Sequence, residues 1–263
     1  MAIMETTVWS RVLNCQNEMR IFLPGNGEQY TPEKPYKVIW MNHGGNADCH
    51  EWFGHSSIFN LAGVHGYAVV LLSTYNSFGM NMVHGGQYAT FLEDEVMPLV
   101  RQMLPCLSRR REDNIAAGVS MGGFAAVRWA MNRPEAFGAC AAFAGALAMP
   151  VIYRRYQEGT QPGGPDFDYA FGSVERISGN ENDILYMAEK NQREGRGMPI
   201  YMICGTDDFG FDLNDYMQRE FIRRGVDVTF CPVTGEHRFD CWEPHMNEFF
   251  DWLKRKGRET ACR

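Results

Sequence analysis

The stretch Gly118-Val119-Ser120-Met121-Gly122-Gly123 decides the fold, because it places a G-x-S-x-G motif between a strand and a helix. Residues 114–119 form a short apolar run that predicts a buried strand, and residues 124–132 are rich in helix formers and stop before Pro134. A serine at such an elbow is exposed as a nucleophile, and flanking glycines let neighbouring backbones approach. The motif alone also fits a glycine turn with an idle serine, but its context favours a nucleophilic Ser120.

Strand-like and helix-like segments alternate along most of the chain. Predicted strands cover residues 18–23, 37–41, 67–73, 114–119, 140–143, 200–204 and 226–231. Predicted helices cover residues 88–104, 124–132, 215–224 and 244–256. Such alternation predicts an α/β fold with a mostly parallel central sheet and helices on both faces. In this architecture ligands bind at the carboxyl ends of the strands, which is where Ser120 lies.

Residues 148–198 interrupt this alternation. Two turn-rich stretches, residues 161–165 and 179–182, lie among scattered aromatic residues in this segment. We interpret the segment as an excursion over the edge of the sheet that caps the active site. Because the sequence shows no internal repeat and no low-complexity tract, we expect a single domain over residues 1–263.

The composition narrows the classes of partner and compartment. The formal charge is −7 and the pI about 5.5, which argues against nucleic acid or an anionic membrane as the main partner. The basic runs at residues 109–111 and 254–256 are interpreted as solvated faces. No apolar run is long enough to span a bilayer, and the N-terminal residues lack the pattern of a secretory signal. Eight cysteines without a C-x-x-C pair indicate a reduced, cytoplasmic protein.

A serine nucleophile requires a base within hydrogen-bond reach, and a histidine usually fills this role. In sheets with this motif the acid and then the histidine follow the serine in sequence. The histidines that lie after residue 84 are His237 and His245. His237 follows the strand predicted at 226–231 and so lies on the same rim as Ser120, whereas His245 falls inside the next helix. His237 is therefore the expected base.

The acid and the oxyanion donors are expected at the ends of other strands. Residues 200–204 run into Asp207 and Asp208, and reasoning from the residues does not choose between these two carboxylates. Donors for the oxyanion are expected from the backbone N–H of Met121, directly after the nucleophile, and from the glycine-rich loop at residues 42–46.

A second group of polar residues resembles a metal site by composition. It follows the strand predicted at residues 37–41 and holds His43, Asp48, Cys49, His50, Glu51 and His55. Its spacing matches no common ligand pattern, so we expect no metal. The chain also lacks a P-loop and a G-x-G-x-x-G motif after a strand, and we expect no cofactor.

The ordered set of motifs resembles that of a known family, the esterase D / tributyrin esterase family of α/β-hydrolases. This family includes S-formylglutathione hydrolases and several acetyl and feruloyl esterases. The resemblance runs from about residue 18 to the C-terminus and rests on His43-Gly44, Gly86-Gln87-Tyr88, Gly118 to Gly123, Cys204 to Phe209, and Gly235-Glu236-His237 with Trp242. It implies an α/β-hydrolase fold and a small-molecule ester as substrate.

The resemblance also assigns roles to individual residues. It selects Asp208 over Asp207 as the acid that orients His237, so that Ser120, Asp208 and His237 would form a triad. It places the second oxyanion donor in the region of Gly45. Together with the base and the nucleophile, these assignments imply acyl transfer through an acyl-enzyme.

The resemblance leaves the substrate open. Contacts with it are expected from Gly44, Tyr75, His84 and Trp242, with Phe78 and the aromatic residues of 148–171 as further wall residues. The chain departs from the family pattern at Asn42, Gly45 and Phe124, changes that affect the acyl pocket. We expect a serine carboxylesterase for short-chain or aromatic acyl esters. The alternatives are an S-formylglutathione hydrolase-like thioesterase and a catalytically idle binding protein of the same fold; the oligomeric state, including a homo-oligomer, is left open.

Overall fold

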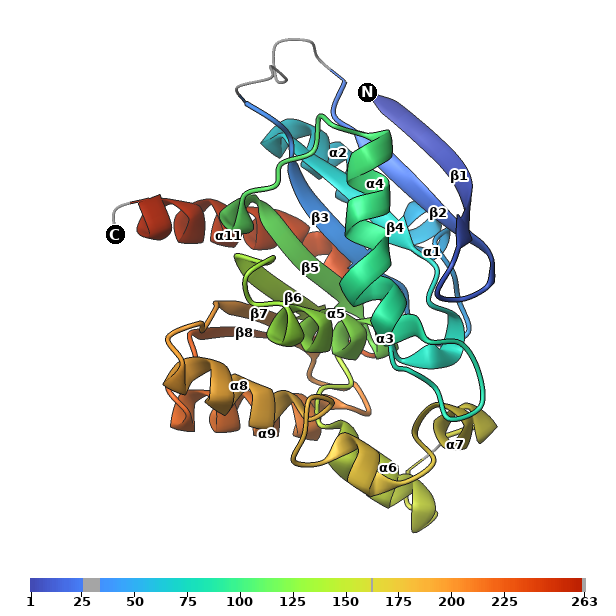
Figure 1. Cartoon of the computed structure of the whole chain (residues 1–263). Helices are drawn as coiled ribbons and strands as arrows, with labels where there is room; N and C mark the ends of the chain where they lie inside the picture. The colour runs from blue at the N-terminus through green and yellow to red at the C-terminus, as the bar shows by residue number, and fades with distance from the viewer. Residues whose placement is uncertain (26–33, 162, 262–263) are drawn as a thin grey trace.

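The structure, a computed structural model, describes residues 1–25, 34–161 and 163–261. Its centre is an eight-stranded sheet with the strand order β1-β2-β4-β3-β5-β6-β7-β8 (Figure 1). The strands are β1 (Ala2–Ser10), β2 (Cys15–Leu23), β3 (Lys37–Asn42), β4 (Tyr67–Leu72), β5 (Asn114–Val119), β6 (Ala139–Phe143), β7 (Ile200–Gly205) and β8 (Val228–Val233). The pairs β1–β2 and β2–β4 are antiparallel, and the other pairs are parallel. The predicted α/β fold with a mostly parallel sheet is confirmed.

Strand β1 was not predicted from the sequence. It lies at the edge of the sheet and pairs with β2 alone, with Ala2 opposite Leu23. Its residues alternate between exposed and partly buried positions, and Ile3 and Trp9 remain exposed. An edge strand with one solvated face carries few buried apolar side chains, so its sequence signal is weak.

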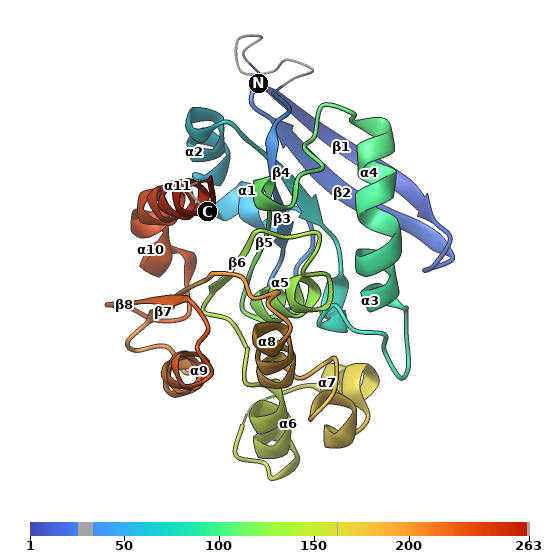
Figure 2. The same ribbon diagram turned by 60° about the vertical axis from the view of Figure 1, so that its left-hand side comes forward.

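Helices cover both faces of the sheet, as predicted (Figure 2). One face carries α3 (Tyr88–Thr90), α4 (Met97–Met103), α5 (Met121–Asn132), α8 (Ile184–Arg193) and α9 (Phe211–Arg223), and a π-helical turn (Phe91–Val96) joins α3 to α4. The other face carries α1 (Glu51–His55), α2 (Ile58–His65), α10 (Phe239–Trp242) and α11 (Met246–Ala261), with the 3-10 turn Glu243–His245 before α11. Each layer of helices encloses its own cluster of buried apolar side chains against the sheet.

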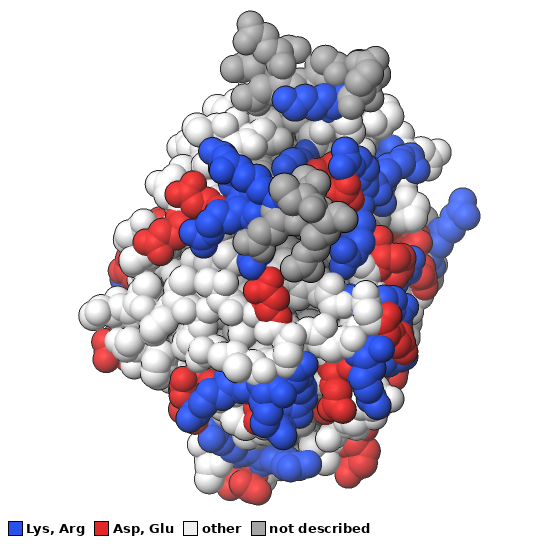
Figure 3. Space-filling model, turned by 90° about the vertical axis from the view of Figure 1, so that its left-hand side faces the viewer, with Lys and Arg blue, Asp and Glu red and all other residues white. Residues whose placement is uncertain are grey.

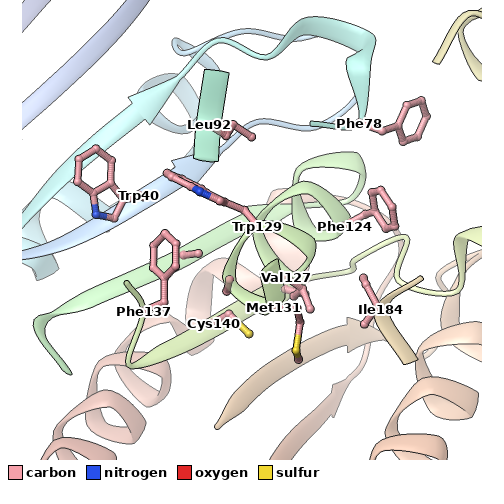
Figure 4. Packing of buried hydrophobic residues seen from close by; sticks show 14 of the residues in the cluster. Trp40, Phe78, Leu92, Phe124, Val127, Trp129, Met131, Phe137, Cys140 and Ile184 are labelled. Atoms are coloured by element: carbon pink, nitrogen blue, oxygen red, sulfur yellow. The ribbon is translucent and has the colours of Figure 1, made fainter. Parts of the chain in front are cut away.

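Helix α5 lies at the centre of the larger cluster. Figure 4 shows Trp129 of this helix beside Trp40 of β3 and Phe137, whose ring centroids lie 6.1 Å and 4.8 Å away. Phe124, one turn into the same helix, is fully buried as well. Because α5 begins directly after Ser120, this packing fixes the position of the nucleophile elbow relative to the sheet.

The segment 148–198 is mostly helical. It contains α6 (Met149–Gln157), α7 (Pro165–Phe171), a 3-10 turn (Val174–Ile177) and α8. Helix α8 packs against α5 and α9 and leads into β7, so it is the crossover helix that a parallel sheet needs rather than part of an excursion. The sequence contains a signal for the start of this helix. Asp183 is its N-cap residue, and its side chain accepts from the N–H groups of Leu185 and Tyr186.

The excursion is therefore confined to the part before α8. Helices α6 and α7 extend away from the two helical layers, beyond the carboxyl ends of the strands (Figure 2). Their function as a cap over the active site, and the treatment of residues 1–263 as one domain, stay predictions.

Lys and Arg side chains gather around the C-terminal end of α11 (Figure 3). Lys37, Arg111 and Lys256 line one depression there, and Lys256 pairs with Asp227 at 2.8 Å.

In the part of the chain that the structure describes, no helix is long and apolar enough to cross a bilayer.

Candidate active site

Ser120 occupies a strained turn between β5 and α5. Its backbone angles, φ 52° and ψ −117°, fall in a region that residues other than glycine rarely adopt. Hydrogen bonds hold the turn on both sides, because the Ser120 N–H donates to Phe143 O at 2.8 Å and Ser120 O accepts from Ala146 N at 3.0 Å. The predicted nucleophile elbow therefore has the backbone conformation that presents a side chain at the end of a strand.

The glycines of the motif are required by close backbone contacts. A Cβ atom on Gly118 would lie 2.2 Å from the carbonyl oxygen of Gly122, and a Cβ atom on Gly122 would lie 2.2 Å from the carbonyl oxygen of His43. Both contacts are shorter than any real Cβ contact and involve backbone atoms, which cannot rotate away. The elbow is thus wedged between β5 and the loop after β3.

Gly122→Ala is expected to destabilise the fold by about 1–3 kcal/mol or more, because the added methyl group forces the elbow away from the loop at His43. The free energy of unfolding from urea denaturation measures this effect. The matched control is Gly257→Ala in α11, where an added Cβ meets no atom within 4 Å and helix propensity favours alanine. Equal stability of the Gly122 variant and the wild type would contradict the wedged elbow.

His237 and Asp208 come together at the ends of β8 and β7. His237 Nδ1 lies 2.7 Å from Asp208 Oδ2, and the side chain of Asp208 is completely buried. The second carboxylate oxygen, Oδ1, accepts from the Gly210 N–H at 2.7 Å, so the carboxylate is held in one orientation. Asp207 is exposed, and its N–H donates to Gly235 O at 2.9 Å. The structure therefore pairs His237 with Asp208 rather than with Asp207.

Ser120 and His237 face one cavity that lies between them and the excursion. With Nδ1 engaged by Asp208, the free ring nitrogen of His237 is Nε2. No hydrogen bond joins Ser120 to this ring in the residues that the structure describes, although both line the cavity. Catalytic hydrogen bonds are often long without substrate and shorten when it binds. His237 is further positioned by Phe209 and Trp242, whose ring centroids lie 4.6 Å and 5.9 Å away.

The two expected oxyanion donors also border this cavity. Met121 is the first residue of α5, where backbone N–H groups have no carbonyl partner inside the helix. Gly45 lies on the cavity wall opposite, in the loop after β3. The N–H of Met121 belongs to the elbow that close backbone contacts hold in place, which is the preorganisation that stabilisation of an oxyanion needs.

His43 is a structural residue of the same loop. Its Nδ1 lies 2.7 Å from Gly44 O, and its Nε2 accepts from the Thr74 N–H at 3.0 Å. Since Thr74 N can only donate, Nε2 is unprotonated and Nδ1–H donates to the carbonyl. Burial lowers the pKa of His43, which agrees with this neutral form.

The cavity has a volume of about 200 Å³, below the usual range for drug-sized ligands. Its apolar walls come from Phe78, Met149, Ile152, Phe167, Phe209 and Leu213. Helices α6 and α7 thus supply part of the wall, together with the loop after β7 and the start of α9. Phe78 and Phe167 were among the expected wall residues, whereas Met149, Ile152 and Leu213 were missed because nothing in the sequence shows where these helices dock.

The predicted substrate contacts at Gly44, Tyr75, His84 and Trp242 are not in the cavity wall. Tyr75 is 44% exposed and its ring packs near Tyr88, while His84 lies beside Tyr169 outside the pocket. Trp242 is buried behind His237 and so supports the ring instead of reaching the substrate. Residues after one strand end spread along the rim, and packing decides which of them point into this cavity. Phe209, directly after Asp208, was the wall residue that spacing alone could have indicated.

The group of polar residues after β3 is only partly assembled. Ligand atoms of Asp48, Cys49 and His50 lie within 4.8 Å of one another, and His50 Nδ1 lies 2.8 Å from Asp48 Oδ1. His43 is engaged in the loop, and the ring of His55 stacks on Phe239 at 5.3 Å. The three neighbours satisfy one another through hydrogen bonds; the absence of a metal stays a prediction.

The sheet order, the strained serine and the Asp–His pair place the chain in the class of serine hydrolases with the α/β-hydrolase fold. A family model described as "Putative esterase" matches residues 10–253. The chain therefore belongs to this esterase family, and the expected resemblance to esterase D and tributyrin esterases is confirmed.

Individual relatives agree with this assignment. An acetyl esterase from Caldicellulosiruptor saccharolyticus is 26% identical over 279 residues, which cover 97% of this chain and 99% of that protein. FphF, a fluorophosphonate-binding serine hydrolase from Staphylococcus aureus, has a TM-score of 0.83 at 22% identity, over 96% of this chain and 98% of that one. The S-formylglutathione hydrolase FrmB from Staphylococcus aureus has a TM-score of 0.79 at 21% identity, over 96% and 98%. These two structures share the fold.

Proposed function

We propose that the protein is a serine carboxylesterase that hydrolyses short-chain or aromatic acyl esters of small molecules through a Ser120–His237–Asp208 triad. The observation that carries this proposal is the buried Asp208 bonded to His237 Nδ1, on the same cavity as the strained Ser120. An idle binding protein of this fold would have no need for a buried carboxylate aimed at a partly exposed imidazole.

The chemistry follows from these positions. His237 Nε2 takes the proton of Ser120 Oγ as this oxygen attacks the ester carbonyl. The resulting oxyanion is stabilised by the N–H groups of Met121 and Gly45, and Asp208 stabilises the imidazolium. His237 then gives its proton to the departing alcohol, which leaves an acyl-enzyme. Water attacks this acyl-enzyme with the same histidine as base, and the carboxylic acid and free Ser120 result.

The size and the lining of the cavity support the substrate class. About 200 Å³ bounded by apolar side chains accommodates a small acyl group and excludes a long chain. Three aromatic side chains in the wall also suit a flat acyl group. The cytoplasmic location stays a prediction.

Acyl-chain preference is expected to follow the cavity wall. For the wild type, kcat/KM on p-nitrophenyl acetate or butyrate should exceed that on the octanoate by about tenfold or more. Ile152→Ala enlarges the cavity and should raise kcat/KM on the octanoate relative to the butyrate, since Ile152 lies in the wall and in α6. Exposed Val64→Ala in α2 is the matched control. An unchanged ratio in the Ile152 variant would place the acyl group elsewhere.

A thioesterase acting on S-formylglutathione or a similar thioester uses the same triad chemistry. A panel of matched oxygen esters and thioesters separates the two activities. A kcat/KM for thioesters more than about tenfold above that for the oxygen esters would replace the carboxylesterase proposal.

A further inference from the structure

A carboxylate lies directly beside the oxyanion loop, and the proposed catalytic steps do not use it. Glu51, the first residue of α1, turns back over the loop after β3, where its Oε2 accepts from the Gly44 N–H at 2.7 Å. A Cβ atom on Gly44 would lie 3.2 Å from Glu51 Oε1, so the carboxylate packs closely against the glycine. Glu51 does not line the cavity, which excludes direct contact with a substrate held there.

Both backbone polar groups of Gly44 are thereby fixed. Its N–H is held by Glu51, and its carbonyl oxygen accepts from His43 Nδ1 at 2.7 Å. The peptide between Gly44 and Gly45 is trans and planar, so the Gly45 N–H points opposite to the Gly44 carbonyl. Holding Gly44 at both ends therefore restricts the direction of the N–H of Gly45, a residue of the cavity wall.

The position of the Glu51 carboxylate is energetically unfavourable in two ways. Burial raises the pKa of Glu51, because desolvation disfavours its charged form. A carboxylate this close to a developing oxyanion is also electrostatically unfavourable. The compensating gain is the hydrogen bond to a loop that contains two consecutive glycines and would otherwise be free to rotate.

We propose that Glu51 is a positioning residue of the oxyanion hole. It holds the Gly44 N–H, and through the peptide of Gly44 it keeps the Gly45 N–H directed at the oxyanion. Its role lies in the transition state rather than in substrate binding. The inference rests on the proposed serine esterase function and names a residue that this function alone does not require.

The test compares Glu51→Ala with Glu51→Gln. Glu51→Ala removes the acceptor, and we expect kcat on p-nitrophenyl butyrate to fall about ten- to a hundredfold with KM changed less than about threefold, since a misdirected donor affects the transition state. Inhibition by an alkylboronic acid, which forms a tetrahedral anion on the serine, should weaken by a similar factor. Glu51→Gln keeps an oxygen that accepts from the Gly44 N–H, so it should retain kcat within about threefold of the wild type.

The matched control is Glu95→Ala. Glu95 Oε1 accepts from the Arg11 N–H at the same distance, 2.7 Å, but it holds the turn between β1 and β2. This variant should lower the melting temperature and leave kcat and boronate affinity unchanged. If Glu51→Ala does not fold, Glu51→Asp serves instead, because the shorter side chain draws the carboxylate away from the Gly44 N–H.

The measurements distinguish a failure of the positioning role from a failure of the esterase function. Normal kcat and normal boronate affinity in a folded Glu51→Ala, or equal losses in Glu51→Gln and Glu51→Ala, would overturn the positioning role while the esterase itself stands. A wild type without Ser120-dependent hydrolysis would overturn the function and this inference together.

Discussion

Replacing Ser120 with alanine is expected to lower kcat for ester hydrolysis by about 10⁴- to 10⁶-fold. The alanine has no Oγ atom to attack the carbonyl, and among the described residues that line the cavity no other carries a hydroxyl group. The remaining rate reflects binding and the oxyanion donors alone. The measurement is hydrolysis of p-nitrophenyl acetate and butyrate by purified wild type and variant.

The fold should survive this substitution. The hydrogen bonds that hold the elbow involve the backbone N–H and C=O of residue 120, and alanine retains both. Thermal unfolding of the variant should therefore match the wild type within a few degrees, which separates loss of chemistry from loss of structure. More than about 1% of wild-type kcat in a folded, carefully purified variant would refute the nucleophilic role.

Asp208→Asn should reduce kcat by about 10³- to 10⁴-fold, a smaller loss than that of the nucleophile. The amide can donate to His237 Nδ1, so the ring proton moves to Nε2, and Nε2 can then no longer accept the proton of Ser120. Asp207→Asn is the matched control, because this exposed neighbour does not contact the imidazole. Its kcat should stay within about threefold of the wild type. A larger loss in the Asp207 variant than in the Asp208 variant would reverse the assignment.

The parallel part of the sheet could be predicted from the sequence because its strands are apolar runs buried on both faces. β4 and β5, for example, have no exposed residue. β1 could not, since half of its residues face solvent and its pairing depends on β2. Helix α8 was assigned to the excursion because the turn-rich residues 179–182 directly precede it and because its contact with α5 is long-range information.

The residues of the site also fall into those that the sequence indicates and those that it does not. Ser120 and His237 could be identified because local motifs and strand order place them on one rim. The choice of Asp208 over Asp207 depends on which side chain points toward His237. The family resemblance answered this question, and the residues alone did not. The cavity wall depends on how α6, α7 and α9 dock, so Met149, Ile152 and Leu213 carry no local signal.

The excursion between β6 and β7 also bears on how a chain of this kind can change its specificity. Residues 149–171 contribute Met149, Ile152 and Phe167 to the cavity, yet Ser120, Asp208 and His237 all lie outside this stretch. Insertions or exchanges within it can therefore reshape the space for the acyl group while the elements that perform the chemistry keep their sequence. Evolution, or directed selection in the laboratory, can treat this stretch as a replaceable module and acquire a new ester substrate without rebuilding the catalyst.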